Sequence, residues 1–185
     1  MQMRIRDRDA TRAGLLAAGA RLATSGGMSK LTVGAVVETA GASKGAFFHH
    51  FPTREQFVLE LHREFHDRMA VAVAVAIAPL APGRERLMAG AEAYWTLCLR
   101  ERGMRACLVE ARIDPAIADE ARARTDAMAA MVAVDLEALG VADPKATAPL
   151  VLAMISEVAA IEDVGGRALP ATRRALEAML PEGRS

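Results

Sequence analysis

Apolar residues recur along most of the chain at the spacing of a helix that buries one face. The first such segment covers residues 10–24 and ends at Ser-Gly-Gly, residues 25–27. Its apolar positions are Leu15, Ala18, Gly19 and Leu22. Alternation typical of strands is confined to the Ala-Val run at 70–76, which lies inside a segment without turn signals. The pattern therefore predicts an all-helical chain.

Two short helices follow, and each is marked by a capping residue. Thr32 stands before a helix at 33–40, which Gly41 ends, and Ser43 stands before a helix at 44–51. Short polar side chains at these positions accept hydrogen bonds from first-turn amides. The sequence therefore predicts two short helices joined by a tight Gly-Ala-Ser turn.

Thr53, with Gln56 three positions later, forms a capping box that opens a long fourth helix towards Ile77. Glycine, proline and Asp-Pro pairs divide the rest of the chain. We expect about nine helices in all, the later ones at 84–101, 104–111, 115–140, 144–165 and 171–180.

The composition is that of a globular helical protein: 52% of the 185 residues are hydrophobic and 4% are aromatic. Two cysteines are too few for a disulfide framework, the charged first residues do not form a secretory signal, and the apolar run at 69–81 is too short to span a bilayer. We therefore expect a cytoplasmic protein that does not associate with membranes.

Charge is distributed unevenly along the chain. Residues 1–54 hold 8 Lys and Arg against 3 Asp and Glu, a net charge of +5, and the remainder carries −5. A basic N-terminal region beside an acidic body points to a polyanionic partner. Segregation of charge onto solvated faces by chance is the alternative that charge alone leaves open.

The two short helices, braced by a helix on each side, make a helix-turn-helix. Its second helix enters the major groove of DNA, so the exposed face near its N-terminus needs small or hydrogen-bonding groups. Lys44, Gly45 and Ala46 meet this need, because the small residues allow close approach and the lysine reaches a guanine or a phosphate.

Three Phe and two His are gathered at 47–51. Phe47 and Phe51 are four positions apart and so share one helix face, which we expect in the core, while Phe48 and His49 point outward. For His50 two roles stay open, a phosphate contact and a structural role near the turn. The alternative interpretation is a metal site formed by these histidines with His62 and His66. Adjacent histidines on a helix point in different directions, however, and no further ligand completes the set. We therefore expect no metal and no cofactor.

The stretch LTVGAVVETAGASKGAFFHHFPTREQF, residues 31–57, resembles the signature of the tetracycline-repressor-like (TetR) family of bacterial transcription regulators, and the resemblance extends over about residues 8–60. It implies DNA contacts from Thr32, Ser43, Lys44, Gly45, Phe48, His49, His50 and Arg54. Arg54 stands where the family most often has Lys, and we expect it to bind phosphate. Phe48 replaces the usual Tyr and so lacks the hydroxyl that commonly bonds a phosphate.

The resemblance divides the chain into a DNA-binding domain at 1–54 and a ligand-binding and dimerisation domain at 55–185, linked by the helix from residue 53. No nucleophile, phosphate loop or paired carboxylate marks a catalytic site, so we do not expect an enzyme. Adaptable apolar residues suggest a cavity for a largely apolar effector, with plain core packing as the alternative for each residue. These residues are Tyr94, Trp95, Cys98, Leu99, Met104, Cys107, Leu108, Met128, Met131 and Met154. For the two cysteines, inert burial and a thiol-based sensor both stay open.

The last two helices carry apolar stripes that suit either the core or a dimer face, and the resemblance implies the dimer face. The residues are Val151, Ile155, Val158, Ile161, Leu176 and Met179. Glu157, Glu162 and Asp163 lie among them and are expected at a solvated rim. The function that follows is a homodimeric repressor that binds an inverted-repeat operator in double-stranded DNA and is released by a small molecule. A regulator with a packed, ligandless body that acts through a protein partner is the alternative.

Overall fold

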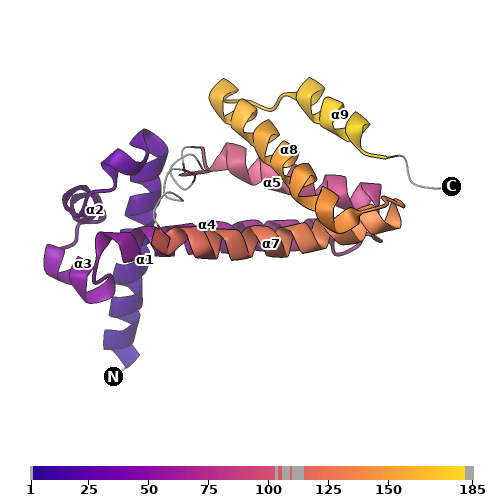
Figure 1. Ribbon diagram of the computed structural model, residues 1–185. Helices are drawn as coiled ribbons and strands as arrows, with labels where there is room; N and C mark the ends of the chain where they lie inside the picture. Colours follow the sequence, from indigo (N-terminus) through magenta and orange to yellow (C-terminus); the bar gives the residue numbers. More distant parts are fainter. Residues whose placement is uncertain (1, 103, 106–108, 110–114, 182–185) are drawn as a thin grey trace. The chain divides into compact units, whose positions relative to one another are not determined.

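The computed structural model describes residues 2–102, 104, 105, 109 and 115–181, with the backbone alone at 2–7, 115 and 116 (Figure 1). The part of the chain so described contains helices and no strand, which confirms the predicted all-helical class. The elements are α1 (Gln2–Gly26), η1 (Met28–Lys30), α2 (Val33–Ala40), α3 (Lys44–His50), α4 (Arg54–Ile77), α5 (Arg84–Arg100), α7 (Pro115–Ala138), α8 (Pro144–Gly165) and α9 (Pro170–Met179). The helix expected at 104–111 falls largely outside the described residues.

The first helix is longer than the sequence pattern indicates. It was expected to begin at residue 10, but α1 begins at Gln2. The charged residues at its start give no apolar periodicity, yet none of them breaks a helix, so the helix extends into them. Hydrophobic spacing detects only the part of a helix that carries a periodic apolar face.

The chain forms two compact units, one of Met1–Phe65 with Gly103–Ala118 and the other of His66–Arg102 with Asp119–Ser185. α4 contributes to both through its continuous backbone. Within the described residues, no helix has both the length and the apolar content that crossing a bilayer requires.

The core of the first unit is aromatic. Phe47, Phe51 and Phe57 are at most 1% exposed, and their ring centroids lie 5.0–5.5 Å apart in tilted and edge-on pairs. Such pairs contribute about 0.5–1.5 kcal/mol each beyond the area that they bury. The cluster joins α3 to the start of α4 and confirms that Phe47 and Phe51 are core residues.

Gly19 lets α1 approach this cluster closely. A Cβ atom at this position would lie 2.5 Å from Cζ of Phe57 and 2.9 Å from Cδ1 of Leu61, both of which are buried. Real Cβ atoms do not approach other atoms so closely, so any larger residue would force the helices apart. The glycine is therefore explained by packing against α4.

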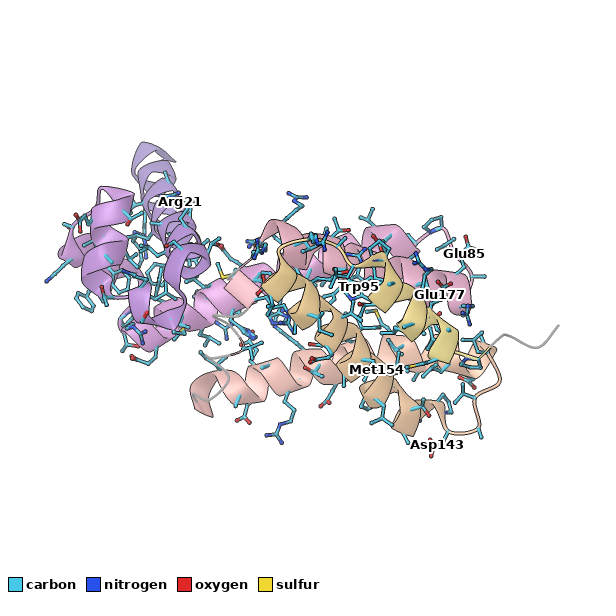
Figure 2. The ribbon with its side chains drawn as sticks, turned by 90° about the horizontal axis from the view of Figure 1, so that it is seen from above. Arg21, Glu85, Trp95, Asp143, Met154 and Glu177 are labelled. Carbon is cyan, nitrogen blue, oxygen red and sulfur yellow. The ribbon has the colours of Figure 1, made fainter. Side chains whose placement is uncertain are left out.

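The second unit has its centre at Trp95 of α5, which is fully buried (Figure 2). The indole Nε1 donates to the Ile155 carbonyl of α8 at 2.9 Å, and the Arg173 guanidinium of α9 lies 4.9 Å from the ring centroid. Arg173 also donates to both carboxylate oxygens of Glu162 at 2.7 and 2.6 Å. One indole and one arginine thus bind α5, α8 and α9 together.

Glu162 corrects one expectation, because it is fully buried and does not lie at a solvated rim. Burial raises its pKa, but hydrogen bonds from Arg173 and from the Leu169 amide, with the charge of Arg173, outweigh that effect and hold the pKa below its ordinary value. The partners come from the turn and helix that follow, so they could not be read from the neighbours of Glu162 in α8.

Candidate nucleic-acid interface

Side-chain caps fix the start of both short helices, as the sequence predicts. The Ala35 amide donates to Thr32 Oγ1 at 3.2 Å, and the Ala46 amide donates to Ser43 Oγ at 3.0 Å. Between them, Gly41 has φ 65°, a left-handed conformation in which its amide donates to the Glu38 carbonyl. A residue without Cβ is favoured there, and the result is a sharp turn between α2 and α3.

α3 divides into a buried face and an exposed face. Phe47 is fully buried, whereas Phe48 is 49% exposed. Lys44, Gly45 and His49 are also exposed, and Ala46 and His50 are half-buried. The residues expected to read DNA therefore share the solvent side of one helix in the first unit, together with the exposed cap residues Thr32 and Ser43.

Nothing in the described protein requires glycine at position 45. A Cβ atom there would meet only Ser43 Oγ at 3.7 Å, an ordinary contact, and its φ is not positive. Glycine in a helix costs roughly 0.5–1 kcal/mol relative to alanine. The small residue is thus unexplained by packing inside the protein.

Arg54, the first residue of α4, has partners that the sequence did not reveal. Its Nε donates to the Leu31 carbonyl at 2.7 Å and its Nη2 donates to the Met28 carbonyl at 3.2 Å. Both acceptors lie in the segment that leads into α2; Leu31 is 23 positions and Met28 is 26 positions before Arg54. No local pattern could have indicated this contact, because it depends on the tertiary approach of the start of α4 to η1 and the residue that follows it.

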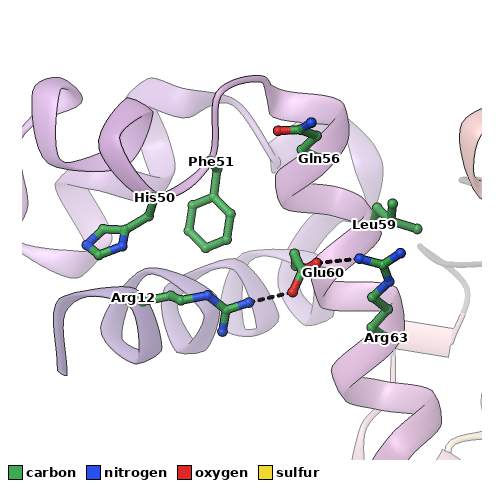
Figure 3. Close-up of a pocket in the computed structure, with 7 residues that line it drawn as sticks. All are labelled: Arg12, His50, Phe51, Gln56, Leu59, Glu60 and Arg63. Carbon is green, nitrogen blue, oxygen red and sulfur yellow. Dashed lines mark hydrogen bonds and ion pairs between the residues drawn. The ribbon is translucent and has the colours of Figure 1, made fainter. Parts of the chain in front are cut away.

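His50 lies beside a pocket of about 460 Å³ formed by α1, the end of α3 and α4 (Figure 3). In the pocket wall Glu60 pairs with Arg12 of α1 and with Arg63 of α4. Burial lowers the pKa of His50, as do electrostatic interactions with His49, Arg8 and Arg12, while Asp9 opposes them. The lowered pKa favours the neutral imidazole, which can donate only one hydrogen bond.

The expected effector-pocket residues are placed as follows. Trp95 and Cys98 are buried in the second unit, Met131 is 37% exposed, and Tyr94, Leu99, Met128 and Met154 are half-buried there. Met104 is buried but belongs to the first unit. Cys107 and Leu108 lie outside the described residues.

The expected dimer-face residues separate into two groups. Val151, Ile155, Val158 and Leu176 are at most 6% exposed and pack inside the second unit, whereas Ile161 is 42% and Met179 is 70% exposed. Two further apolar residues of α8, Leu150 at 65% and Val164 at 90%, are exposed and were missed by the sequence reasoning. Leu150 lies seven residues before Glu157 and Val164 seven residues after it. This heptad spacing places both on one face of α8 and could have indicated them.

Among the residues that the structure describes, no three His, Cys, Asp or Glu side chains come together in a group that could hold a metal ion.

Comparison with known proteins gives one family and one fold. A sequence profile of the family described as "Bacterial regulatory proteins, tetR family" matches residues 15–61. A transcriptional regulator from Rhodococcus sp. Rha1 is similar in structure, with 21% identity, a TM-score of 0.80, and coverage of 91% of this chain and 93% of that chain. A TetR-like transcriptional regulator from the same source, Rhodococcus sp. RHA1, has 18% identity, a TM-score of 0.78 and coverage of 91% and 92%.

Reduced NemR from E. coli is also similar, with 16% identity, a TM-score of 0.72 and coverage of 92% of this chain and 95% of that chain. No curated protein matches the chain. At these identities the likenesses establish the fold alone.

Proposed function

Because this chain belongs to the TetR family of DNA-binding transcription regulators, we propose that it is a repressor that binds an inverted-repeat operator as a homodimer and leaves it when a small molecule binds. The exposed face of α3 is the observation that carries the proposal. On it, Lys44, Gly45, Phe48 and His49 stand clear of the core that Phe47 and Phe51 form.

The chemistry of this face suits the major groove. Gly45 allows the backbone of α3 to approach base edges. No packing contact inside the protein requires a glycine there, which supports that use. Lys44 reaches a guanine or a phosphate, and Phe48 packs on sugar or a thymine methyl in place of a hydroxyl contact. The capped first turns of α2 and α4 add amide donors towards the DNA backbone.

A second copy of the chain is the proposed cover for the exposed face of α8, on which apolar side chains flank the exposed Glu157. Leu150, Ile161 and Val164 lie on this face, and a two-fold axis through it makes the same residues meet their equivalents. A two-fold dimer presents two reading helices to half-sites about 34–36 Å apart, or a multiple of that distance. This symmetry is the reason to expect an inverted repeat.

The proposed effector is a largely apolar small molecule bound in the second unit near α5 and α8. Ligand there acts by changing the relative stability of two states of the protein, since an effector shifts an equilibrium only through differential affinity. α4 runs without interruption from the first unit into the second and is the element proposed to carry the change.

The full packing of Trp95 favours a second candidate. This side chain, expected to line an effector cavity, is fully buried and hydrogen bonded to Ile155. A regulator whose body is packed and which acts through a protein partner has no need of such a cavity. The two candidates differ in whether any small molecule releases DNA.

Selection of duplexes from a random-sequence pool by the full chain tests the DNA-binding proposal. Recovery of an inverted repeat, with weaker binding by the Lys44→Ala and His49→Ala variants at fixed salt, is the expected result. Failure to enrich any duplex would overturn it. A thermal-shift ligand screen, followed by operator release with each hit, separates the effector-released repressor from the ligandless regulator.

Sedimentation of two variants tests the dimer. Val164→Glu places a charge on the proposed interface and is expected to yield monomers. Val71→Glu is the matched control, because Val71 is 64% exposed on α4 of the same unit and lies on no proposed interface. Equal sedimentation of Val164→Glu and the wild type would refute the α8 interface.

A further inference from the structure

Arg54 occupies a position where a cation is expected to face DNA, yet its side chain is directed into the protein. Two of its donors are engaged with the carbonyls of Leu31 and Met28, and the residue is half-buried. These bonds connect the first residue of α4 to the segment that precedes α2. The contact joins the starts of two helices.

The Leu31 carbonyl needs such a donor. It lies just before the cap residue Thr32, whose own carbonyl already accepts the Val36 amide as the first bond of α2. Leu31 itself is fully buried, and a buried carbonyl without a donor is costly. Arg54 Nε supplies the bond at 2.7 Å.

A guanidinium is well suited to bind both carbonyls in this geometry. Its donors form a rigid planar fork, so Nε and Nη2 can bind two acceptors at once without loss of their relative direction. A lysine ammonium carries the same charge but is a point donor on a flexible stem. An arginine-to-lysine change at this site therefore keeps the charge and loses the bridge.

The same fork lies between two helix starts that face the proposed DNA surface. Thr32 caps α2 through the Ala35 amide, and Thr53 caps α4 through the Gln56 amide at 3.1 Å. First-turn amides act on a phosphate only when they are held in place. A residue that joins the segment before Thr32 to the residue after Thr53 fixes the two first turns relative to each other.

We propose that Arg54 is a positioning residue for DNA binding, which acts by bridging the Leu31 and Met28 carbonyls and so holding the starts of α2 and α4 in register, and that it is not a phosphate contact. The inference rests on the DNA-binding function proposed above. In this role Arg54 neutralises no phosphate, so it does not contribute to the salt dependence of DNA binding.

The test compares Arg54→Lys, Arg54→Gln and Lys44→Ala with the wild-type chain. Affinity for a labelled duplex selected by the wild type is measured by anisotropy over a range of salt concentrations, at a temperature where far-UV circular dichroism shows each variant folded. We expect about a tenfold loss for Arg54→Lys and for Arg54→Gln, with the slope of log affinity against log salt unchanged. Lys44→Ala is the charge control: where Lys44 binds a phosphate, its loss should reduce the magnitude of the slope by about 0.9, the value for one lost phosphate contact.

A phosphate contact gives the opposite pattern. Arg54→Lys would then bind like the wild type. Arg54→Gln would reduce the magnitude of the slope of log affinity against log salt by about 0.9. Either result overturns the proposal. A wild-type chain that selects no duplex overturns the DNA-binding function instead, which keeps the two failures distinct. A role in global stability alone is excluded if folded Arg54→Lys still binds weakly.

A measurement on the wild type covers the case in which the variants do not fold. The Nε–H signal of Arg54, assigned by NMR, is expected to be protected from solvent exchange in the free protein and to keep its chemical shift when the duplex is added. Loss of protection, or a large shift on DNA binding, would show that the guanidinium leaves the carbonyls for the DNA and would overturn the proposal.

Discussion

Replacement of Gly45 by alanine should stabilise the protein and weaken its binding to DNA. The added Cβ meets only Ser43 Oγ at 3.7 Å, so it fits without strain, and a helical glycine replaced by alanine gains roughly 0.5–1 kcal/mol. With a urea dependence of about 1–2 kcal/mol per molar, the unfolding midpoint should rise by roughly 0.25–1 M.

The same methyl group stands on the face proposed to approach the bases. Displacement of the helix from the groove removes several hydrogen bonds at once, and we expect at least about a tenfold loss of affinity, equivalent to about 1.4 kcal/mol. Urea titration by far-UV circular dichroism and anisotropy with a selected duplex measure the two effects separately.

Gly14→Ala is the control for the gain in helix stability. Gly14 lies in α1, and a Cβ there would meet nothing within 4 Å. This variant should be stabilised to a similar extent and should bind DNA as the wild type does. If Gly45→Ala binds DNA with unchanged affinity, α3 does not approach DNA through this residue. The absence of a packing reason for Gly45 is then no sign of DNA contact.

Two further substitutions test the packing of the units. Gly19→Ala should destabilise the first unit by about 1–3 kcal/mol despite the better helix former, because its Cβ would lie 2.5 Å from the buried Phe57 ring; a rise in the urea midpoint would contradict this. Glu162→Gln should cost about 1–3 kcal/mol, since it removes the charged partner of the largely buried Arg173, which keeps its ion pair with Glu92. The lowered pKa of Glu162 means that its contribution is complete above the ordinary glutamate pKa of about 4.3 and is lost as the pH falls through the folded value, so the variant should lose less stability in acid than the wild type.

The helix starts were predictable from local signals in the sequence. Thr32 and Ser43 each cap a helix in the structure as predicted, because a cap depends only on residues within three positions of it. Asp143, in one of the Asp-Pro pairs, caps α8 in the same way. The face of Phe47 and Phe51 was predictable for the same reason, since helical spacing alone decides it.

Contacts between distant segments were not predictable in this way. The apolar stripe of α8 is wide, and its period does not tell which edge meets α5 and which is left for another molecule: Ile155 is core, whereas Val164 is 90% exposed. Arg54 and Glu162 have partners in loops or helices that approach only in the folded chain. In both cases a charged residue expected at a surface was engaged by groups that the sequence could not place.

The position of Trp95 has a consequence for spectroscopy. It is the single tryptophan of the chain, the single tyrosine is its neighbour Tyr94, and both belong to the second unit. The aromatic residues of the DNA-binding unit are phenylalanines, which barely emit under the excitation used for indole. Intrinsic fluorescence therefore reports the body of the protein alone, with an indole whose emission is sensitive to the charge of Arg173 above its ring. A change in that emission on adding DNA would be a direct optical record, without any label, that the two units communicate.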